Sequence, residues 1–369
     1  MATNRAIAVS AGHKNSSRIV DIELPSIDES EVLVRVLEVG ICGTDAELDE
    51  GLYGETPSDE MFLVIGHESL GIVEEVGASV NNLKKGDYVV ATVRRPCPKC
   101  VNCENEQNDM CLTGEYLERG IKGLHGYMVN YYKERPEFLI KVPQRHRNIG
   151  VLLEPLSIIE KAVTQTLEMQ KRMFWDPKKV LVLGAGPIGL LATMLFRNLG
   201  LEVYTLATRS SDSLKATLVC ETGATYINVK KDPIITLKSK VGSFDLIVDA
   251  TGSAEAAFDS ICLLETNGVL CLTSVTCGAK KIEIDVDKLN LDLVLGNKIV
   301  YGIVNSNPAH FKSGVQHFDE FEKKWPGLMS RLITRRESFE NFKKALTKER
   351  EDIKTVLEIS SEKAYNADS

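Results

Sequence analysis

The sequence has little of what marks membrane proteins, nucleic-acid-binding proteins or disulfide-rich secreted proteins. Only 6% of its 369 residues are aromatic, so it offers no row of stacking rings for single-stranded nucleic acid. The formal net charge is −8 and there is no basic stripe, which argues against a nucleic-acid partner. No apolar run reaches membrane-spanning length, and the first residues lack the apolar core of an export signal. We therefore expect a cytoplasmic protein with neither a membrane nor a nucleic-acid partner.

The nine cysteines do not form the even, regularly spaced set of a disulfide framework. Four of them are clustered, as Cys97, Cys100, Cys103 and Cys111, and the other five are scattered. Two short gaps and one longer gap allow four thiolates to meet around one tetrahedral metal ion. The spacing fits zinc, and an iron–sulfur cluster is the alternative. Because the protein would supply all four ligands, we expect this site to be structural rather than catalytic.

Two hydrophobic patterns divide the chain. Short alternating runs between glycine turns, such as 31–42 and 62–77, predict a mostly β first domain. From about residue 150, helical patterns alternate with continuous apolar strands, which predicts a doubly wound parallel sheet and an α/β fold. The expected first domain covers 1–175 and 301–369, with the cysteine lobe near 94–112, and the second covers 176–300. In the second domain we expect strands at 178–186, 202–208, 243–252 and 269–275, and helices at 187–200, 211–223 and 254–268.

A glycine-rich loop lies between the first strand and the first helix of the second domain. It reads Gly-Ala-Gly-Pro-Ile-Gly and fits the G-x-G-x-x-G pattern that binds a dinucleotide pyrophosphate at a helix N-terminus. The second strand ends without the acid that selects NAD; Arg209 stands there, and a guanidinium suits a 2′-phosphate. The pattern favours NADP, while Asp212 keeps NAD open and Arg209 could instead be a solvated loop residue. The expected cofactor contacts in these loops are Gly184, Gly186, Pro187, Ile188, Gly189, Thr208, Arg209 and Ser210.

A second metal site is indicated by two short glycine-framed segments, GICGTD at 40–45 and GHE at 66–68. Cys42, His67 and Glu68 offer a thiolate, an imidazole and a carboxylate, and catalytic zinc takes about three protein ligands. Glu154, near the expected domain junction, is a further candidate, although the proline that follows it could equally mark a helix start. Each of these residues taken alone has an ordinary structural explanation.

In this order, GICGTD, GHE, the four-cysteine lobe and GAGPIG resemble the zinc-dependent medium-chain dehydrogenases over essentially the whole chain. Four further stretches resemble one branch, the archaeal-type glucose dehydrogenases. They are TVRRPC (92–97), CLTGEYLERGIKGLHGYM (111–128), EPLSIIEKA (154–162) and YGIVNSNPAHF (301–311). The resemblance implies a GroES-like catalytic domain beside a Rossmann domain, and oxidation of an aldose such as D-glucose, or D-galactose, at C1 to the lactone.

The resemblance also assigns roles to individual residues. It implies a catalytic zinc on Cys42, His67 and Glu68, with Glu154 as a ligand or nearby contact, and a structural zinc on the four-cysteine lobe. It implies that Thr44 passes the proton to solvent, although Thr44 could simply cap a helix. The implied substrate contacts are Thr44, Glu118, Glu154 and Asn305, and the residues at the nicotinamide end are Thr273, Ser274, Val275, Ile303, Val304 and Asn305. A homotetramer is implied as well, with 269–303 as a source of an interface strand.

Two departures and two rival functions remain. Val93 and Ile158 stand where members of the branch often carry an asparagine and an acid, which could shift preference to another aldose or relax sugar discrimination. The nearest rival is the same zinc chemistry on an alcohol or polyol. The other is a non-catalytic nucleotide-binding protein, against which the set of Cys42, His67 and Glu68 argues. Glu118 and Asn305 could also be a solvated acid and a turn residue.

Overall fold

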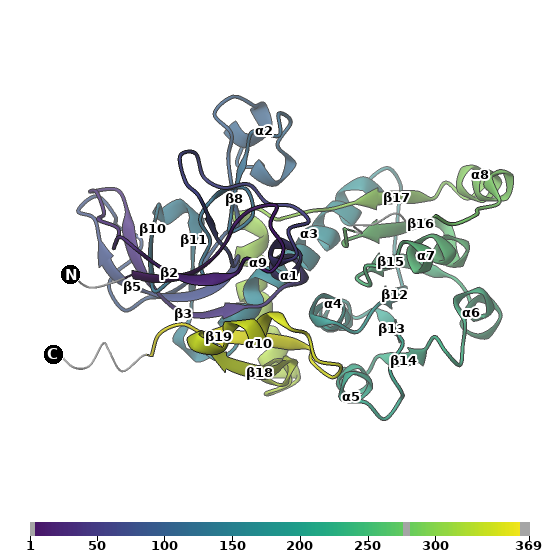
Figure 1. Cartoon of the computed structure of the whole chain (residues 1–369). Coiled ribbons are helices and arrows are strands. Elements are labelled where there is room, and N and C mark those ends of the chain that lie inside the picture. Colours follow the sequence, from purple (N-terminus) through teal and green to yellow (C-terminus); the bar gives the residue numbers. More distant parts are fainter. Residues whose placement is uncertain (1–3, 276–280, 362–369) are drawn as a thin grey trace. The chain divides into compact units, whose positions relative to one another are not determined.

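The computed structural model describes residues 4–275 and 281–361 (Figure 1). Contacts between residues divide the chain into two compact units. The first unit comprises Met1–Glu154, Asn305–Gln316 and Met329–Ser369, and the second comprises Pro155–Val304 and His317–Leu328. The expected boundary near residue 175 therefore differs from this division. The reason is helix α3 (Leu153–Gln170), whose Lys161 and Gln170 donate hydrogen bonds to the carbonyl groups of Val304 and Asn267.

The first unit is mostly β, as its sequence pattern predicts. Its strands are β1 (Asn4–Val9), β2 (Arg18–Ile22), β3 (Val32–Gly40), β4 (Leu63–Val64), β5 (Glu68–Val76), β6 (Tyr88–Ala91), β7 (Arg94–Arg95), β8 (Leu117–Arg119), β9 (Gly123–Leu124), β10 (Tyr131–Glu134), β11 (Leu139–Val142), β18 (Ile333–Ser338) and β19 (Lys354–Glu358). The main sheet has the order β11-β6-β5-β3-β19-β18, and β10 also pairs with β3. Smaller sheets have the orders β2-β1-β4 and β7-β8-β9.

Strand β3 is the centre of this unit, because every one of its residues is buried. It pairs antiparallel with β5 on one side and with β19 on the other. The C-terminal strand β19 therefore returns the chain to the first unit, as expected for residues 301–369. Helices in this unit are α1 (Gly43–Asp49), α2 (Val101–Glu104), α10 (Phe342–Leu346) and the first part of α9 (Pro308–Lys324).

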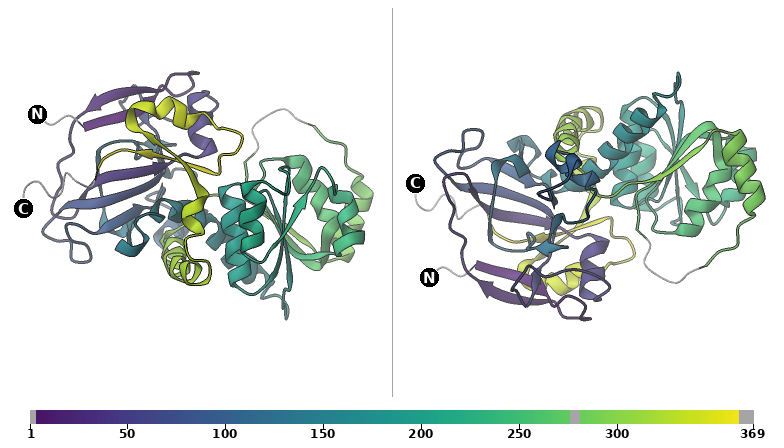
Figure 2. Two further views of the ribbon diagram at one scale, coloured as in Figure 1. Left: turned by 90° about the horizontal axis from the view of Figure 1, so that it is seen from below. Right: turned by 90° about the horizontal axis from the view of Figure 1, so that it is seen from above.

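The second unit contains the expected parallel sheet. Its strands are β12 (Lys179–Leu183), β13 (Glu202–Ala207), β14 (Thr225–Asn228), β15 (Phe244–Asp249), β16 (Leu264–Leu272) and β17 (Ile299–Gly302), in the order β14-β13-β12-β15-β16-β17. Its further helices are α4 (Pro187–Asn198), α5 (Leu214–Glu221), α6 (Ile234–Val241), α7 (Ala254–Asp259) and α8 (Val286–Leu295). Figure 2 shows α4 and α5 on one face of the sheet and α6 and α7 on the other. The prediction of a doubly wound α/β fold is confirmed.

One predicted helix of this unit is wrong in its second half. The sequence pattern suggested a helix over 254–268, but α7 ends at Asp259, a single 3₁₀ turn follows, and β16 starts at Leu264. Strand β16 starts earlier than expected because Leu264, which is fully buried, pairs with Phe244 of β15. The register between the two strands shifts directly after this pair. The next residues, Glu265 and Thr266, are both exposed, so the start of β16 lacks the regular alternation of buried and exposed residues that marks a strand.

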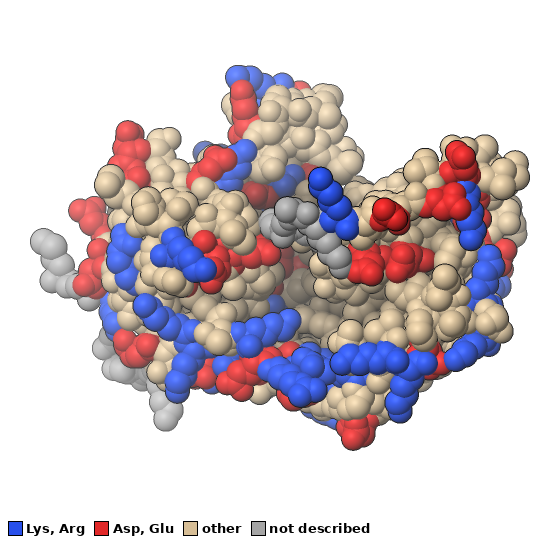
Figure 3. Space-filling view, turned by 45° about the vertical axis from the view of Figure 1, so that its right-hand side comes forward, with Lys and Arg blue, Asp and Glu red and all other residues tan. Residues whose placement is uncertain are grey.

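Charged side chains of both signs lie on the face shown in Figure 3. The absence of a nucleic-acid partner stays a prediction. Among the residues that the structure describes, no helix combines the length and the apolar character needed to cross a bilayer.

Candidate active site

Three side chains from two segments of the first unit converge on one point. Cys42 follows β3 and is the residue before α1, His67 lies in the turn between β4 and β5, and Glu68 begins β5. Pairing of β3 with β5 sets Glu68 opposite Gly40, two residues before Cys42. The potential ligand atoms of Cys42, His67 and Glu68 all lie within 4.8 Å of one another. The set that the sequence suggested is thus brought together.

The glycine at position 40 has a specific role in this arrangement. A Cβ atom at Gly40 would lie 2.3 Å from Oε2 of Glu68, well inside van der Waals contact. A side chain at this position would force the Glu68 carboxylate to move from the place it takes here. The first glycine of GICGTD therefore belongs to the site as much as the cysteine does.

Asp45 is a member of the site that the sequence reasoning missed. Its carboxylate is fully buried, and it accepts hydrogen bonds from the amides of Cys42 (2.9 Å) and Gly66 (3.2 Å). Its Oδ1 lies 3.7 Å from Nδ1 of His67. Burial alone would lower the pKa of His67, but the charge of Asp45, together with Cys42 and Glu154, outweighs it and holds that pKa well above the usual value. The signal was available, because an acid three residues after a helix-capping position typically turns back to that cap.

Lys354 is a second member that was missed, and the sequence held no signal for it. Its Nζ donates to Oε2 of Glu68 at 2.5 Å and to the carbonyl of Ile41 at 3.0 Å. Both side chains of this ion pair are only 2% exposed. Lys354 comes from β19, which pairs with β3, so only the tertiary fold brings the ammonium group to the site.

Glu154 and Thr44 flank the three ligand candidates. Glu154 is buried in the first turn of α3, outside the set of three whose ligand atoms meet within 4.8 Å. Burial and, after it, the charge of Glu68 raise the pKa of Glu154 to about 7. The Oγ1 of Thr44 lies 3.8 Å from Sγ of Cys42, whose thiol is directed to it. Thr44 does not cap α1, since Cys42 occupies the capping position.

The donor set fits a catalytic zinc ion. One thiolate, one imidazole and one carboxylate are ligand types that zinc accepts together, and they leave a coordination position open. A buried carboxylate beside the histidine is the partner that metal-bound histidines usually have, and Asp45 supplies it. Lys354 gives the Glu68 carboxylate a comparable fixed partner.

The four clustered cysteines meet as the spacing predicts. The sulfur atoms of Cys97, Cys100, Cys103 and Cys111 all lie within 4.8 Å of one another. Backbone amides point at two of them, from Cys103 to Sγ of Cys100 at 3.5 Å and from Cys97 to Sγ of Cys103 at 3.4 Å. Four thiolates at this distance repel one another unless a cation sits among them, so the cluster fits a structural zinc ion.

Two of the expected sugar contacts are in direct contact with each other. Asn305 Nδ2 donates to Oε1 of Glu118 at 2.9 Å, and both residues are buried. Neither residue is therefore a solvated surface group. Asn305 has a left-handed backbone (φ 60°), which asparagine tolerates better than most residues. Val93 is buried next in sequence to β7, and Ile158 is half-buried on α3.

The glycine-rich loop has the shape that a pyrophosphate needs. Gly184 has a φ of 102°, and a Cβ there would lie 2.7 Å from the carbonyl oxygen of Ala250. A Cβ at Gly189 would lie 2.0 Å from the carbonyl oxygen of Gly184, so helix and loop pack too closely for any side chain. At Gly186 a Cβ would meet no atom within 4 Å, which leaves this side of the loop open to a ligand. Pro187 and Ile188 open α4 directly behind it.

The other expected cofactor residues follow the carboxyl ends of neighbouring strands, where ligands bind to open α/β sheets. Thr208, Arg209 and Ser210 follow β13, and the hydroxyl of Tyr226 donates to the Arg209 carbonyl at 2.8 Å. Thr273, Ser274 and Val275 follow β16, and Ile303 and Val304 follow β17. Asn305, expected at both cofactor and substrate, lies in the first unit and contacts Glu118.

Comparison with known proteins agrees with both units. Residues 147–359 match the family described as the glucose dehydrogenase C-terminus, and residues 28–144 match the alcohol dehydrogenase GroES-like domain. A glucose 1-dehydrogenase of Methanocella arvoryzae is 50% identical over 97% of this chain and 100% of its own. Glucose 1-dehydrogenase 1 of Caldivirga maquilingensis is 42% identical over 96% of this chain and 99% of its own.

Solved structures give the same result. Haloferax mediterranei glucose dehydrogenase, solved in complex with NADP, Zn and gluconolactone, is 34% identical with a TM-score of 0.87. The match covers 97% of this chain and 99% of that one. The expected α/β architecture of a GroES-like domain and a Rossmann sheet is confirmed. The chain belongs to the archaeal-type glucose 1-dehydrogenase branch of the zinc-dependent medium-chain dehydrogenases.

Proposed function

We propose that this protein oxidises an aldose, D-glucose first and D-galactose as a possible second substrate, at C1 to the lactone with NADP as hydride acceptor. The observation that carries the proposal is the similarity of the whole chain to glucose 1-dehydrogenases, together with its cluster of Cys42, His67 and Glu68. One similar glucose dehydrogenase has been solved in complex with NADP, Zn and gluconolactone. The intact cluster argues against a non-catalytic nucleotide-binding protein.

The residues of the first unit divide the chemistry among them. Cys42, His67 and Glu68, with Glu154 beside them, would hold a zinc ion, which when bound acts as a Lewis acid toward the C1 hydroxyl. Oxidation removes a hydride from C1, which passes to C4 of the nicotinamide, and a proton from the C1 hydroxyl. Oγ1 of Thr44, half-buried and 3.8 Å from the Cys42 sulfur, takes this proton and passes it on to solvent. Glu118 and Asn305 hold sugar hydroxyls by hydrogen bonds.

The second unit holds the cofactor. Gly184, Gly186 and Gly189 let the pyrophosphate approach the N-terminus of α4. The half-buried Arg209 binds the 2′-phosphate, with the exposed hydroxyls of Thr208 and Ser210 as further donors. The loops at 273–275 and 303–304 line the nicotinamide end. A lone Asp212 does not replace the NAD-selecting acid, because its carboxylate accepts a hydrogen bond from Ser210 in the same loop.

The proposal also includes a homo-oligomeric assembly, specifically a homotetramer. β17 is an edge strand of the parallel sheet, and α8 before it exposes Val286, Leu291, Val294 and Leu295. Such an apolar edge is typical of a surface that a second copy covers. Residues 276–280 of the expected interface segment lie outside the described part of the chain. A cytoplasmic location fits the cysteines that the structure describes, all of which are free thiols.

The test is a set of initial rates on aldoses, polyols and simple alcohols, with NADP and NAD in parallel, and zinc counted per chain. The proposal expects aldose turnover, a preference for NADP and two zinc ions per chain. Turnover of alcohols or polyols without any aldose would contradict the sugar assignment and leave the zinc chemistry in place. That second candidate is favoured by one observation, the buried apolar Val93 at a position where a polar sugar contact was expected.

A further inference from the structure

Arg94 is a buried arginine to which the sequence analysis gave no role. Its side chain is 4% exposed, and its Nε and Nη2 donate to Oε1 of Glu118 at 3.1 and 2.9 Å. The two residues stand directly opposite each other in the antiparallel pair of β7 and β8. An arginine fork that closes on one carboxylate oxygen fixes both the place and the rotation of that carboxylate.

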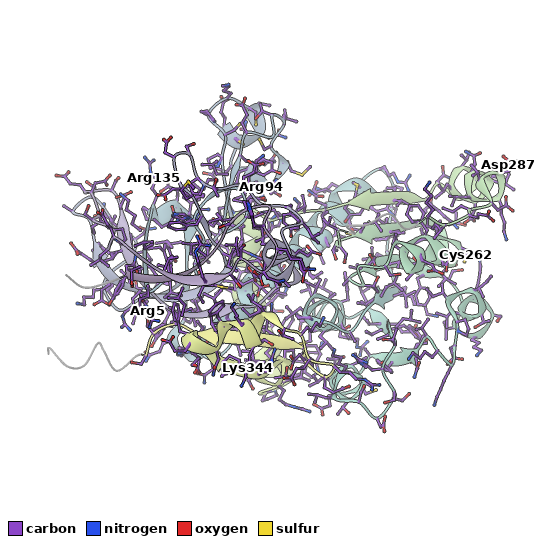
Figure 4. The ribbon with its side chains drawn as sticks, viewed as in Figure 1. Arg5, Arg94, Arg135, Cys262, Asp287 and Lys344 are labelled. Atoms are coloured by element: carbon purple, nitrogen blue, oxygen red, sulfur yellow. The ribbon has the colours of Figure 1, made fainter. Side chains whose placement is uncertain are left out.

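The other side of the same guanidinium is tied to the cysteine lobe. Nη1 of Arg94 donates to the carbonyl of Asp109 at 3.0 Å, and Asn108 Nδ2 donates to the Arg94 carbonyl at 2.6 Å. Asp109 is two residues before Cys111. The centre of the Tyr116 ring, five residues after Cys111, lies 3.7 Å from the guanidinium carbon. Figure 4 labels Arg94 at the base of the lobe that contains α2. The folded lobe therefore holds this arginine from several sides.

The arrangement leaves one oxygen of Glu118 available. Oε1 receives all the donors, two from Arg94 and one from Asn305. Among the described residues, no recorded hydrogen bond ends on Oε2. A second tie, from Asn307 Nδ2 to Oδ1 of Asp109 at 3.2 Å, connects the Asn305 segment to the lobe as well. Oε1 of Glu118 is thus occupied by hydrogen bonds within the protein, and Oε2 is the oxygen that can accept a hydrogen bond from a ligand.

We propose that Arg94 is a positioning residue for sugar recognition. It transmits the folded state of the four-cysteine lobe to Glu118, so that Oε2 is held ready to accept a hydrogen bond from an aldose hydroxyl. The proposal rests on the proposed function in one respect, the sugar contact of Glu118. It gives the structural zinc site a consequence for substrate binding, beyond the stability of the lobe itself.

The first experiment compares Arg94→Lys with wild-type enzyme in steady-state kinetics. Lysine keeps the charge but cannot bond Glu118 and the Asp109 carbonyl as a planar fork. We expect KM for glucose to rise roughly tenfold to a hundredfold, the range for a lost hydrogen bond to a charged group, while kcat changes much less. KM for NADP should stay within about twofold, since the expected phosphate and nicotinamide contacts other than Asn305 belong to the second unit.

Arg95→Lys is the matched control. Arg95 is the next residue, also buried, and its guanidinium binds Glu134 and Tyr127 instead of Glu118. This variant should lose thermal stability as a buried arginine substitution does, without raising KM for glucose relative to KM for NADP. Zinc content is measured in both variants, and it should remain two per chain in each. An equal rise of KM for glucose in both variants would overturn the positioning role.

A double-mutant cycle separates this inference from the proposed function. If Arg94 acts through Glu118, adding Arg94→Lys to Glu118→Ala should raise KM for glucose by less than about twofold further. If Glu118→Ala leaves that KM unchanged, both the sugar contact and the role of Arg94 are wrong. If Glu118→Ala raises it and Arg94→Lys does not, or if the two effects simply multiply, only the role of Arg94 is wrong.

A milder variant covers the case in which Arg94→Lys does not fold. Tyr116→Leu keeps Arg94 and Glu118 and removes the ring against the guanidinium, which Lys122 Nζ also approaches, 4.6 Å from the ring centre. The half-buried Tyr116 tolerates such a change better than a fully buried residue would. We expect a rise of about two- to fivefold in KM for glucose, from the size of a cation–π contact, with KM for NADP unchanged. An unchanged KM for glucose in this folded variant would count against the proposal.

Discussion

The two clusters of potential zinc ligands are built in opposite ways. The lobe takes its four cysteines from one stretch between Cys97 and Cys111, and short gaps alone determine that the sulfurs meet. The other cluster takes Cys42, His67 and Glu68 from different segments and depends on Asp45 and Lys354 to hold them. A local site can be identified by counting residues, whereas a site of this second kind is a product of strand pairing. The two should therefore fail in different ways when they are mutated.

The largest expected effect comes from the ligands themselves. Cys42→Ser should lower kcat/KM by about 10⁴-fold, since a bound metal supplies several kcal/mol of transition-state stabilisation. Zinc content should fall from two to one per chain, and thermal stability should change little, because the lobe stays intact. Cys103→Ser is the matched variant in the other cluster: it should also leave one zinc, but with a clear loss of stability. Equal effects of the two substitutions on stability and on rate would remove the distinction between the two sites.

Lys354 tests whether the second cluster depends on the tertiary fold. Lys354→Met leaves the Glu68 carboxylate buried without its cation, and breaking a buried pair in this way typically costs about 3–5 kcal/mol. We expect a free energy of unfolding lower by that amount in urea titrations, together with weaker retention of one zinc ion against a chelator. Lys354→Arg, which keeps the charge, should recover much of both.

If Lys354→Met unfolds at the same urea concentration as wild type and keeps both zinc ions, the ion pair has no part in the site. The double variant Lys354→Met/Glu68→Gln gives a further check, since removing both charges should restore part of the stability that the single variant loses.

A smaller effect on stability is expected at Glu134, a buried carboxylate that forms ion pairs with Arg95 and Arg119. Burial alone would raise the pKa of Glu134, but Arg95 and Arg119 outweigh it and lower that pKa to about 2. The unfolded chain has its ordinary value of 4.5, so the charged carboxylate stabilises the fold above about pH 4.5 and loses this contribution as the pH falls toward 2. Glu134→Gln should lower the free energy of unfolding at pH 7 by on the order of 3 kcal/mol.

The measurement for Glu134 is the difference in melting temperature between variant and wild type across the acid range. The difference should be constant above about pH 5.5 and should shrink as the pH falls to about 3. Loss of metal at low pH affects both proteins and cancels in the difference. A difference that stays constant down to pH 3 would show that Glu134 is not ionised more easily in the folded state.

The same contrast explains what the sequence could and could not predict. Cys97 to Cys111 and the loop from Gly184 to Gly189 were predictable, because their chemistry depends on spacing within a few residues. The alternation of strands and helices gave the fold class for the same reason. Lys354 was not predictable, because nothing in its neighbourhood marks it and β19 reaches the site only by pairing beside β3. The start of β16 was missed because its first residues, from Leu264 to Asn267, do not alternate between buried and exposed with a period of two.

The smallest expected effect extends the comparison to the second unit, where binding again depends on local residues. Arg209→Gln should raise KM for NADP by about tenfold or somewhat more, the size of a lost charge-assisted hydrogen bond to phosphate, and leave KM for NAD nearly unchanged. Steady-state kinetics with both cofactors measures this directly, and KM for NAD in the same variant serves as the internal control. The Tyr226 hydroxyl holds the Arg209 carbonyl, so the loop should keep its backbone after the side chain is changed. If KM rises equally for NADP and NAD, Arg209 supports the conformation of the loop and does not bind the 2′-phosphate. The preference for NADP would then have to come from other residues of the second unit.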